Sequence, residues 1–158
     1  MAFDSVQPGA LKSQQSLVVD NSVMMRWLVD DGSPSDRRYA NRILNSIQGT
    51  HQRVLVPYIW VYESAFVVNY YVGEGALGTA QATDHLNALY DLCTVVIDRE
   101  PPAMLFDFSR SHGVSAYDAA YLMMALSQGS QIATLDKKMR QVASRLDIEV
   151  LPGKSKSR

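Results

Sequence analysis

Five short apolar runs recur along the sequence, and longer stretches with helical signals separate them. The runs read SLVVD at 16–20, RVLVP at 53–57, TVVID at 94–98, IATL at 132–135 and IEVLP at 148–152. Short runs rich in valine, isoleucine and leucine are typical of strands that are buried on both faces of a parallel sheet. Because helices alternate with these strands, we predict an α/β protein, a three-layer α/β/α sandwich with a central, mainly parallel sheet.

The intervals between the runs carry the start and stop signals of helices. The clearest case has Ser33 as N-cap, Pro34 at the first helical position and Asp36 three residues after the cap, while Gly49 follows the last turn. Similar signals predict helices at about 22–29, 34–48, 57–71, 100–111, 115–128 and 137–146. One further helix follows the turn after 57–71 and ends at about Leu92.

The length of the chain and the composition of its ends indicate a single domain. A chain of 158 residues is long enough to bury one core of ordinary size. The first residues show no lasting period, and the last ones include the small, basic stretch GKSKSR. We therefore predict a mobile leader over 1–15, one domain over 16–151 and a mobile basic tail over 152–158.

Charge and cysteine content exclude several classes of protein. A net charge of −1 provides no overall basic field for a nucleic-acid partner, although metal bound to several acids would leave the rest of the chain positive. The single cysteine, Cys93, excludes an intramolecular disulfide framework, and the first residues lack a signal pattern. These two features favour a cytoplasmic protein. Pro57 and Glu63 interrupt the longest apolar segment, so we predict no membrane span.

Three acidic residues stand near the carboxyl ends of predicted strands, where parallel sheets bind their ligands. Asp20 follows LVV, Asp136 follows IATL, and Asp118 lies in the first turn of the helix that precedes IATL. All three positions also suit helix caps, because Asp20 and Asp136 can serve as N-caps and Ser115 with Asp118 fits a capping box. Their spacing alone leaves both interpretations open.

A fourth acid, Glu63, lies in the middle of a predicted helix. Its neighbours on the same face are Ile59, Trp60, Phe66 and Val67, and the helix is apolar nearly all round, so we expect it to be largely buried. Burial of an unpaired carboxylate costs several kcal/mol even after relaxation. Either an arginine or a bound divalent cation must therefore compensate this charge.

Four carboxylates within a few ångströms of one another would raise each other's pKa and destabilise the fold unless a hard cation shares them. A set of carboxylates without histidine or cysteine suits Mg²⁺ or Mn²⁺. Such an ion can polarise a phosphoryl oxygen and lower the pKa of a bound water. The residues proposed as metal ligands and catalytic groups are Asp20, Glu63, Asp118 and Asp136.

The motifs VVDNS, VYES, SAYDAAYL and ATLD occur in this order, and with them the sequence resembles the PIN-domain proteins. Within that family it is similar to the VapC-type toxins of bacterial toxin–antitoxin pairs, over nearly all of residues 16–151. The resemblance implies a PIN-like sandwich in which the same four acids bind the metal. It also implies that Ser22 supports Asp20 and that Thr134 is the hydroxyl neighbour of Asp136.

The resemblance further implies an activity and partners. Similar proteins are Mg²⁺- or Mn²⁺-dependent endoribonucleases that hydrolyse a phosphodiester to leave 5′-phosphate and 3′-hydroxyl ends. A cognate antitoxin typically blocks their site, often with an arginine among the acids, and they are commonly homodimers. Many relatives begin almost directly with the first strand, so the leader before residue 16 departs from their pattern.

Other interpretations of the sequence remain open. The stretch GEGALG at 73–78 matches a dinucleotide-binding fingerprint. The apolar segment before it is long for a strand, and Glu74 would repel a pyrophosphate, so a turn between helices is the alternative. A PIN-like scaffold that binds RNA or a partner without cleavage is a second possibility. Lys137 and Lys138 could contact an RNA phosphate or form a solvated helix face.

Overall fold

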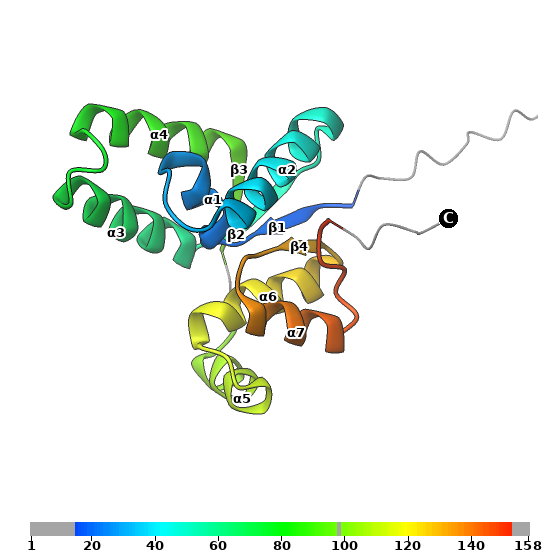
Figure 1. Cartoon of the computed structure of the whole chain (residues 1–158). Coiled ribbons are helices and arrows are strands. Elements are labelled where there is room, and N and C mark those ends of the chain that lie inside the picture. The colour runs from blue at the N-terminus through cyan, green and yellow to red at the C-terminus, as the bar shows by residue number, and fades with distance from the viewer. Residues whose placement is uncertain (1–14, 98, 153–158) are drawn as a thin grey trace, which may run out of the picture.

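The computed structural model describes residues 15–97 and 99–152 and has a four-stranded sheet at its centre (Figure 1). The strands are β1 (Leu17–Val19), β2 (Val54–Pro57), β3 (Cys93–Val96) and β4 (Gln131–Ala133). They lie in the order β3-β2-β1-β4, and every pairing between them is parallel. The predicted α/β fold with a central parallel sheet is confirmed.

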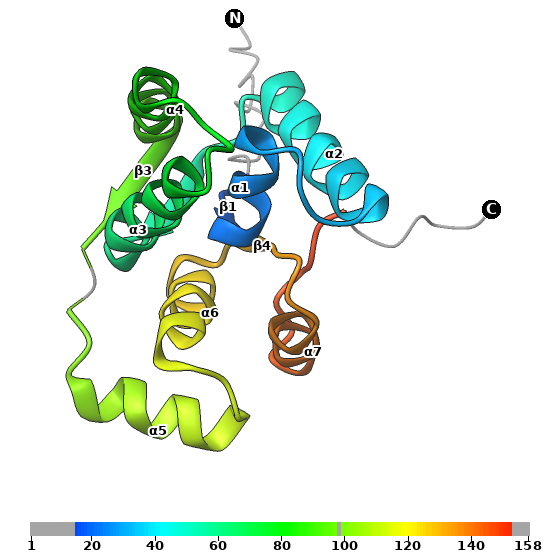
Figure 2. The ribbon, with the colours of Figure 1, turned by 60° about the vertical axis from the view of Figure 1, so that its left-hand side comes forward.

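Helices cover both faces of this sheet. In Figures 1 and 2, α1, α2 and α3 lie on one side, α6 and α7 lie on the other, and α5 lies beyond α6. Helix α4 packs on α3 and leads into β3. The helices are α1 (Asn21–Leu28), α2 (Pro34–Thr50), α3 (Ile59–Gly73), α4 (Thr79–Leu92), α5 (Pro102–His112), α6 (Ala116–Gln128) and α7 (Lys137–Arg145).

The inner strands form the centre of the core. All of β1 is inaccessible to solvent, and in β2 the Leu55 and Val56 side chains are equally covered. Full burial of such a side chain contributes about 1.5–3 kcal/mol. The apolar runs of β1 and β2 therefore fold as strands that are covered on both faces, and Asp20 follows β1 at the edge of the sheet.

The signals at the start of α2 act as predicted, but those at its end do not. Ser33 Oγ accepts a hydrogen bond from the Asp36 amide (3.1 Å), and the Asp36 carboxylate accepts one from the Ser33 amide (3.3 Å). The helix continues through Gly49 to Thr50. It ends because His51 adopts a left-handed conformation with φ 54° and donates its amide hydrogen to the Ile47 carbonyl.

The prediction of a fifth strand at 148–152 is wrong. This segment forms a single parallel bridge to β4, between Val150 and Ile132. Asp147, with φ 57°, turns the chain just before the segment, and Pro152 at its end has no amide hydrogen to donate. The predicted mobile ends fall mainly on residues 1–14 and 153–158, which lie outside the described residues.

The expectation that α3 is largely buried is also wrong. Trp60, Ser64 and Val68 are buried, but a row of aromatic side chains on the opposite flank is open to solvent. Helix α3 packs against α1 and α4, and these contacts leave its third flank open. In residues 15–97 and 99–152, no helix combines the length and apolar character that crossing a membrane would require.

Two leucines one turn apart on α6 test the packing of this layer. Leu122 is fully buried, whereas Leu126 is 44% exposed. We expect Leu122→Ala to lower the free energy of unfolding by about 2–5 kcal/mol, because the substitution leaves a cavity in the core. Leu126→Ala should change it by less than about 0.5 kcal/mol. Urea denaturation of both variants measures the difference, and equal losses would contradict the described packing.

Candidate metal centre

The parallel sheet places several acidic residues at its carboxyl edge. β1 and β4 end side by side, and the Asp20 amide donates a hydrogen bond to the Ala133 carbonyl (2.9 Å). Helix α6 precedes β4 and must run opposite to it, so the first turn of α6, with Asp118, lies at the same edge. Helix α3 starts directly after β2 and brings Glu63 there.

Asp20 is held in place by side-chain hydroxyl groups. It is 7% exposed, and its Oδ2 atom accepts hydrogen bonds from Ser22 Oγ (2.6 Å) and Thr134 Oγ1 (2.8 Å). Those hydroxyls in turn accept from the backbone amides of Leu135 (3.1 Å) and Asp136 (3.0 Å). The Asp20 side chain forms no capping bond to α1. The cap alternative for Asp20 is therefore wrong.

Burial and neighbouring carboxylates raise the pKa values of two acids at the sheet edge, Asp20 and Asp118. Burial raises the pKa of Asp20 above its usual value and the charge of Asp118 raises it further, while the hydroxyls of Ser22 and Thr134 lower it. Burial also raises the pKa of Asp118, with a further contribution from Asp136. The carboxyl groups therefore lie close enough to repel one another when ionised.

Asp118 and Asp136 also take part in helix starts, to different degrees. Ser115 Oγ accepts a hydrogen bond from the Asp118 amide (3.0 Å), but the reciprocal half of the capping box is not formed. Asp136 is exposed, and its Oδ1 atom caps α7 by accepting from the Met139 amide (2.8 Å). The cap prediction is confirmed for Asp136. A second carboxylate oxygen remains for a cation, so the cap does not exclude a ligand role.

Glu63 is half-buried, and a tyrosine orients it. The hydroxyl of Tyr121, a residue only 1% exposed, donates to Glu63 Oε2 (3.0 Å). Burial raises the pKa of Glu63 to about 7; the charges of Asp20 and Asp118 add to this effect, and the bond from Tyr121 opposes it. Among the described residues, no lysine or arginine forms an ion pair with Glu63. The arginine alternative for Glu63 is not found in this part of the chain.

Sequence reasoning missed Tyr121. The residue lies three positions after Asp118 in SAYDAAYL, a spacing that places both side chains on one face of α6. The sequence signal that could have identified Tyr121 is its position one helical turn after the proposed ligand Asp118. Its hydrogen bond connects α6 to α3 and fixes one oxygen of Glu63.

The chemistry of these donors suits a hard divalent cation. Within residues 15–97 and 99–152, no three histidine, cysteine, aspartate or glutamate side chains lie close enough to hold one ion by themselves. Mg²⁺ typically keeps several waters and binds through one or two carboxylates, so direct contact with every acid is not required. Asp20, Glu63 and Asp118 have raised pKa values and form no ion pair with a basic residue in the described part of the chain, and such oxygen donors fit this ion.

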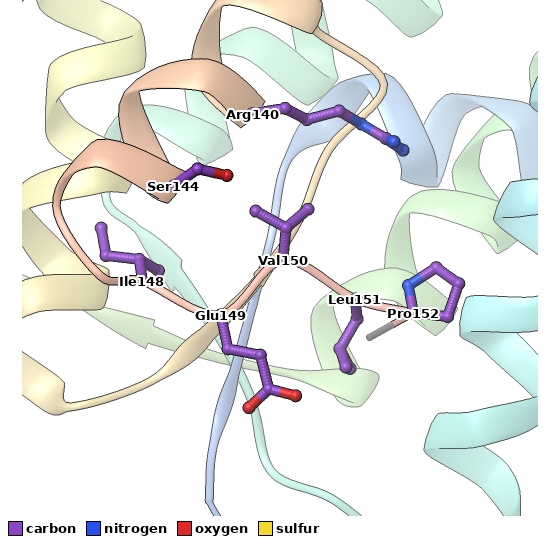
Figure 3. A pocket seen from close by; sticks show the side chains of 7 residues that line it. All are labelled: Arg140, Ser144, Ile148, Glu149, Val150, Leu151 and Pro152. Atoms are coloured by element: carbon purple, nitrogen blue, oxygen red, sulfur yellow. The ribbon is translucent and has the colours of Figure 1, made fainter. Parts of the chain in front are cut away.

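A separate cavity has none of the four proposed ligands in its lining (Figure 3). Its volume is about 510 Å³. The guanidinium of Arg140 is already engaged, because its Nε donates to the Thr134 carbonyl (2.7 Å) and its carbon lies 4.4 Å from the centre of the Tyr39 ring. We therefore assign no ligand to this cavity, which is lined by Arg140, Ser144, Ile148, Glu149, Val150, Leu151 and Pro152.

The stretch GEGALG forms the connection between α3 and α4, in which Gly75 has φ 74°. A dinucleotide-binding fingerprint requires a strand before it and a helix after it. Here a helix stands in the place of the strand. The dinucleotide alternative is therefore wrong, and the predicted turn between helices is confirmed.

The sequence matches the PIN domain family over residues 17–145, and the chain belongs to this family. Among solved structures it is similar to PAE2754 from Pyrobaculum aerophilum, with 19% identity over 84% of this chain and 90% of that one and a TM-score of 0.60. FitAcB from Neisseria gonorrhoeae matches with 17% identity over 85% and 95% of the two chains and a TM-score of 0.48. No curated protein matches the sequence. The resemblance to PIN domains, which are generally nucleases that use divalent metal ions, is confirmed.

The raised pKa of Glu63 predicts how the metal-free protein responds to pH. In the unfolded chain the group ionises near its ordinary pKa of 4.5, whereas in the folded protein it stays protonated up to about 7. Between these values the folded state binds more protons, so stability falls as pH rises. The full loss would be at most about 3 kcal/mol, and partial exposure of the carboxylate reduces it.

Glu63→Gln should remove this contribution. We expect urea denaturation in the presence of a chelator to show a smaller loss of stability between pH 4.5 and 7 in this variant than in the unchanged protein. Identical pH profiles for the two proteins would contradict the assignment of the shift to Glu63.

Proposed function

We propose that this protein is a Mg²⁺- or Mn²⁺-dependent endoribonuclease. The observation that carries the proposal is that Asp20 is buried at the carboxyl edge of the sheet, is oriented by neutral hydroxyls, and lies close to further acids that form no ion pair within residues 15–97 and 99–152. Membership of the PIN family supports the nuclease class. The metal ligands in this proposal are Asp20, Glu63, Asp118 and Asp136.

In this proposal the residues around the acids have defined roles. A bound divalent ion would polarise a phosphoryl oxygen and make hydroxide available from water. Ser22 and Thr134 fix Asp20 Oδ2, and Tyr121 fixes Glu63 Oε2, so that the remaining oxygens keep their orientation toward the ion.

We also propose that the protein acts in the cytoplasm as the toxin of a toxin–antitoxin pair. The motif resemblance to VapC-type toxins supports this, and a single cysteine suits a reducing compartment. A group of acids without basic partners in the described residues would accept an arginine from an antitoxin.

Neutral variants of the acids test the activity. Asp20→Asn and Asp118→Asn should each reduce Mn²⁺-dependent cleavage of RNA by more than about 100-fold, the upper range for loss of a contact that only supports a ligand. The measurement is product formation from structured RNA with and without Mn²⁺, followed by mapping of the cut ends.

Asp36→Asn is the matched control, because Asp36 belongs to the capping box of α2. It should retain activity. Full activity in either site variant would contradict the mechanism, and RNA binding without Mn²⁺-stimulated turnover by the unchanged protein would favour the scaffold alternative.

We further propose that Lys137 and Lys138 contact the RNA backbone. Lys138 lies beside the turn that starts α6, since its ammonium is 3.6 Å from the position that a Cβ atom on Gly113 would occupy. That turn leads directly to Ser115 and Asp118. A phosphate next to the acids would therefore be within reach of this side chain.

In the Asp118→Asn background, Lys138→Ala should weaken RNA binding and reduce the dependence of log K on log salt by about 0.7, the value for one phosphate of a single strand. Arg145→Ala, at the other end of α7, is the control and should leave the slope unchanged. Fluorescence anisotropy over a salt series measures both, and equal slopes for all three proteins would contradict the contact.

A further inference from the structure

The peptide unit between Thr134 and Leu135 is held from two opposite sides. Its amide, on Leu135, donates a hydrogen bond to Ser22 Oγ (3.1 Å), and its carbonyl, on Thr134, accepts one from Arg140 Nε (2.7 Å). The carbonyl and the amide hydrogen of a planar trans peptide point in opposite directions. Arg140 therefore lies on the side of this peptide unit that faces away from Ser22.

Both hydroxyl groups that orient Asp20 depend on the position of this peptide unit. Ser22 Oγ accepts from the Leu135 amide and donates to Asp20 Oδ2 (2.6 Å). Thr134 Oγ1 donates to the same carboxylate oxygen (2.8 Å) and accepts from the Asp136 amide (3.0 Å). A rotation of the peptide plane would therefore displace both hydroxyl donors of Asp20 together.

The Arg140 side chain is itself fixed in one place. Its guanidinium carbon lies 4.4 Å from the centre of the ring of Tyr39, a residue of α2 that is 5% exposed. The Tyr39 hydroxyl in turn donates to the Leu151 carbonyl. Figure 3 shows the arginine side chain extended from α7. A planar guanidinium that stacks on a buried ring loses little further freedom when it forms a hydrogen bond, so Arg140 can hold the Thr134 carbonyl in one direction.

Charge and orientation would affect metal binding in opposite directions. Burial raises the pKa of Asp20, and the groups that lower it are neutral donors, first of all the hydroxyls of Ser22 and Thr134. Like charges repel, so removal of a positive side chain near a cation site strengthens cation binding if it has any electrostatic effect. Loss of an orienting hydrogen bond weakens cation binding instead. The sign of the change therefore distinguishes the two roles of an arginine.

We propose that Arg140 is a positioning residue of the candidate metal centre and acts on Asp20 through the Thr134–Leu135 peptide unit. The inference rests on the proposed function, because Asp20 is a metal ligand in that proposal. It assigns to a basic residue the task of keeping a divalent-cation site in shape from the far side of a peptide bond.

The Mn²⁺ affinity of the full chain, measured by isothermal titration calorimetry without RNA, tests this role. We expect Arg140→Met to raise the dissociation constant for Mn²⁺ about 10-fold, the lower end of the range for groups that support a metal ligand. Methionine keeps an apolar stem beside Tyr39 but cannot donate to the Thr134 carbonyl. Arg145→Met is the matched control, because it removes the same charge from the exposed end of α7. Its dissociation constant should stay the same or fall slightly.

Two further variants separate orientation from charge and from general stability. Arg140→Lys keeps the positive charge but has neither Nε nor a planar group, so it should weaken Mn²⁺ binding in the same direction. In a Thr134→Val background, Arg140→Met should change the dissociation constant by less than about threefold, because one of the contacts that it supports is already absent. Circular dichroism at the temperature of the titration checks that every variant is folded.

The possible outcomes separate this role from the proposed function. Mn²⁺ binding by the unchanged protein with an unchanged or lower dissociation constant in Arg140→Met would overturn the role of Arg140 alone. An unchanged constant in Arg140→Lys, or equal factors with and without the Thr134 hydroxyl, would do the same. Loss of RNA affinity in Arg140→Met at unchanged Mn²⁺ affinity would overturn it in favour of a phosphate contact. An unchanged protein that binds no Mn²⁺ would overturn the proposed function and this role together.

Discussion

The Thr134 hydroxyl group determines the geometry of the carboxyl edge of the sheet. It is fully buried, donates to Asp20 Oδ2 and accepts from the Asp136 amide, so one atom joins the residue after β1 to the chain after β4. The parallel pairing of Val19 with Ala133 brings these strand ends together. A hydroxyl has one hydrogen to donate, and the Asp20 carboxylate, at 2.8 Å, is a stronger and closer acceptor than the Met139 sulfur at 3.7 Å. The other groups of the candidate centre are arranged around a carboxylate that is fixed in this way.

Neutral donors orient the Asp20 carboxylate without cancelling its charge. Desolvation raises its pKa, and Asp118 raises it further, yet the basic residues that form ion pairs in the described part of the chain lie elsewhere. Arg26 pairs with Asp31, and Arg37 pairs with Asp30, near the connection between α1 and α2. This separation leaves the acids at the sheet edge with an electrostatic cost that a cation can offset. A fold selected only for stability would have little reason to keep that cost.

Local sequence signals predicted the elements well, because strand runs and caps depend on neighbouring residues. They could not predict how a carboxylate is used. Ser33 with Asp36 and Ser115 with Asp118 have the same spacing, yet only the first pair completes a capping box. The last apolar run looks like a strand but forms one bridge. Tyr121 acquires its partner only when α6 lies against α3. For the last apolar run and for Tyr121, the deciding contact joins residues from different elements, which spacing within one element does not describe.

The apolar sequence of helix α3 predicts that the helix is buried, but it does not identify the surface that covers it. Two rows run along the helix at intervals of four, the buried one through Trp60, Ser64 and Val68 and the exposed aromatic one through Tyr62 and Phe66. Glu63 stands between Tyr62 and Ser64, and with about 100° of rotation per residue it falls at the border of the two rows. That position explains a carboxylate buried enough to have a pKa of about 7 yet still open on one side. The open side is the side that the exposed row faces, so whatever covers that row also sets the surroundings of Glu63.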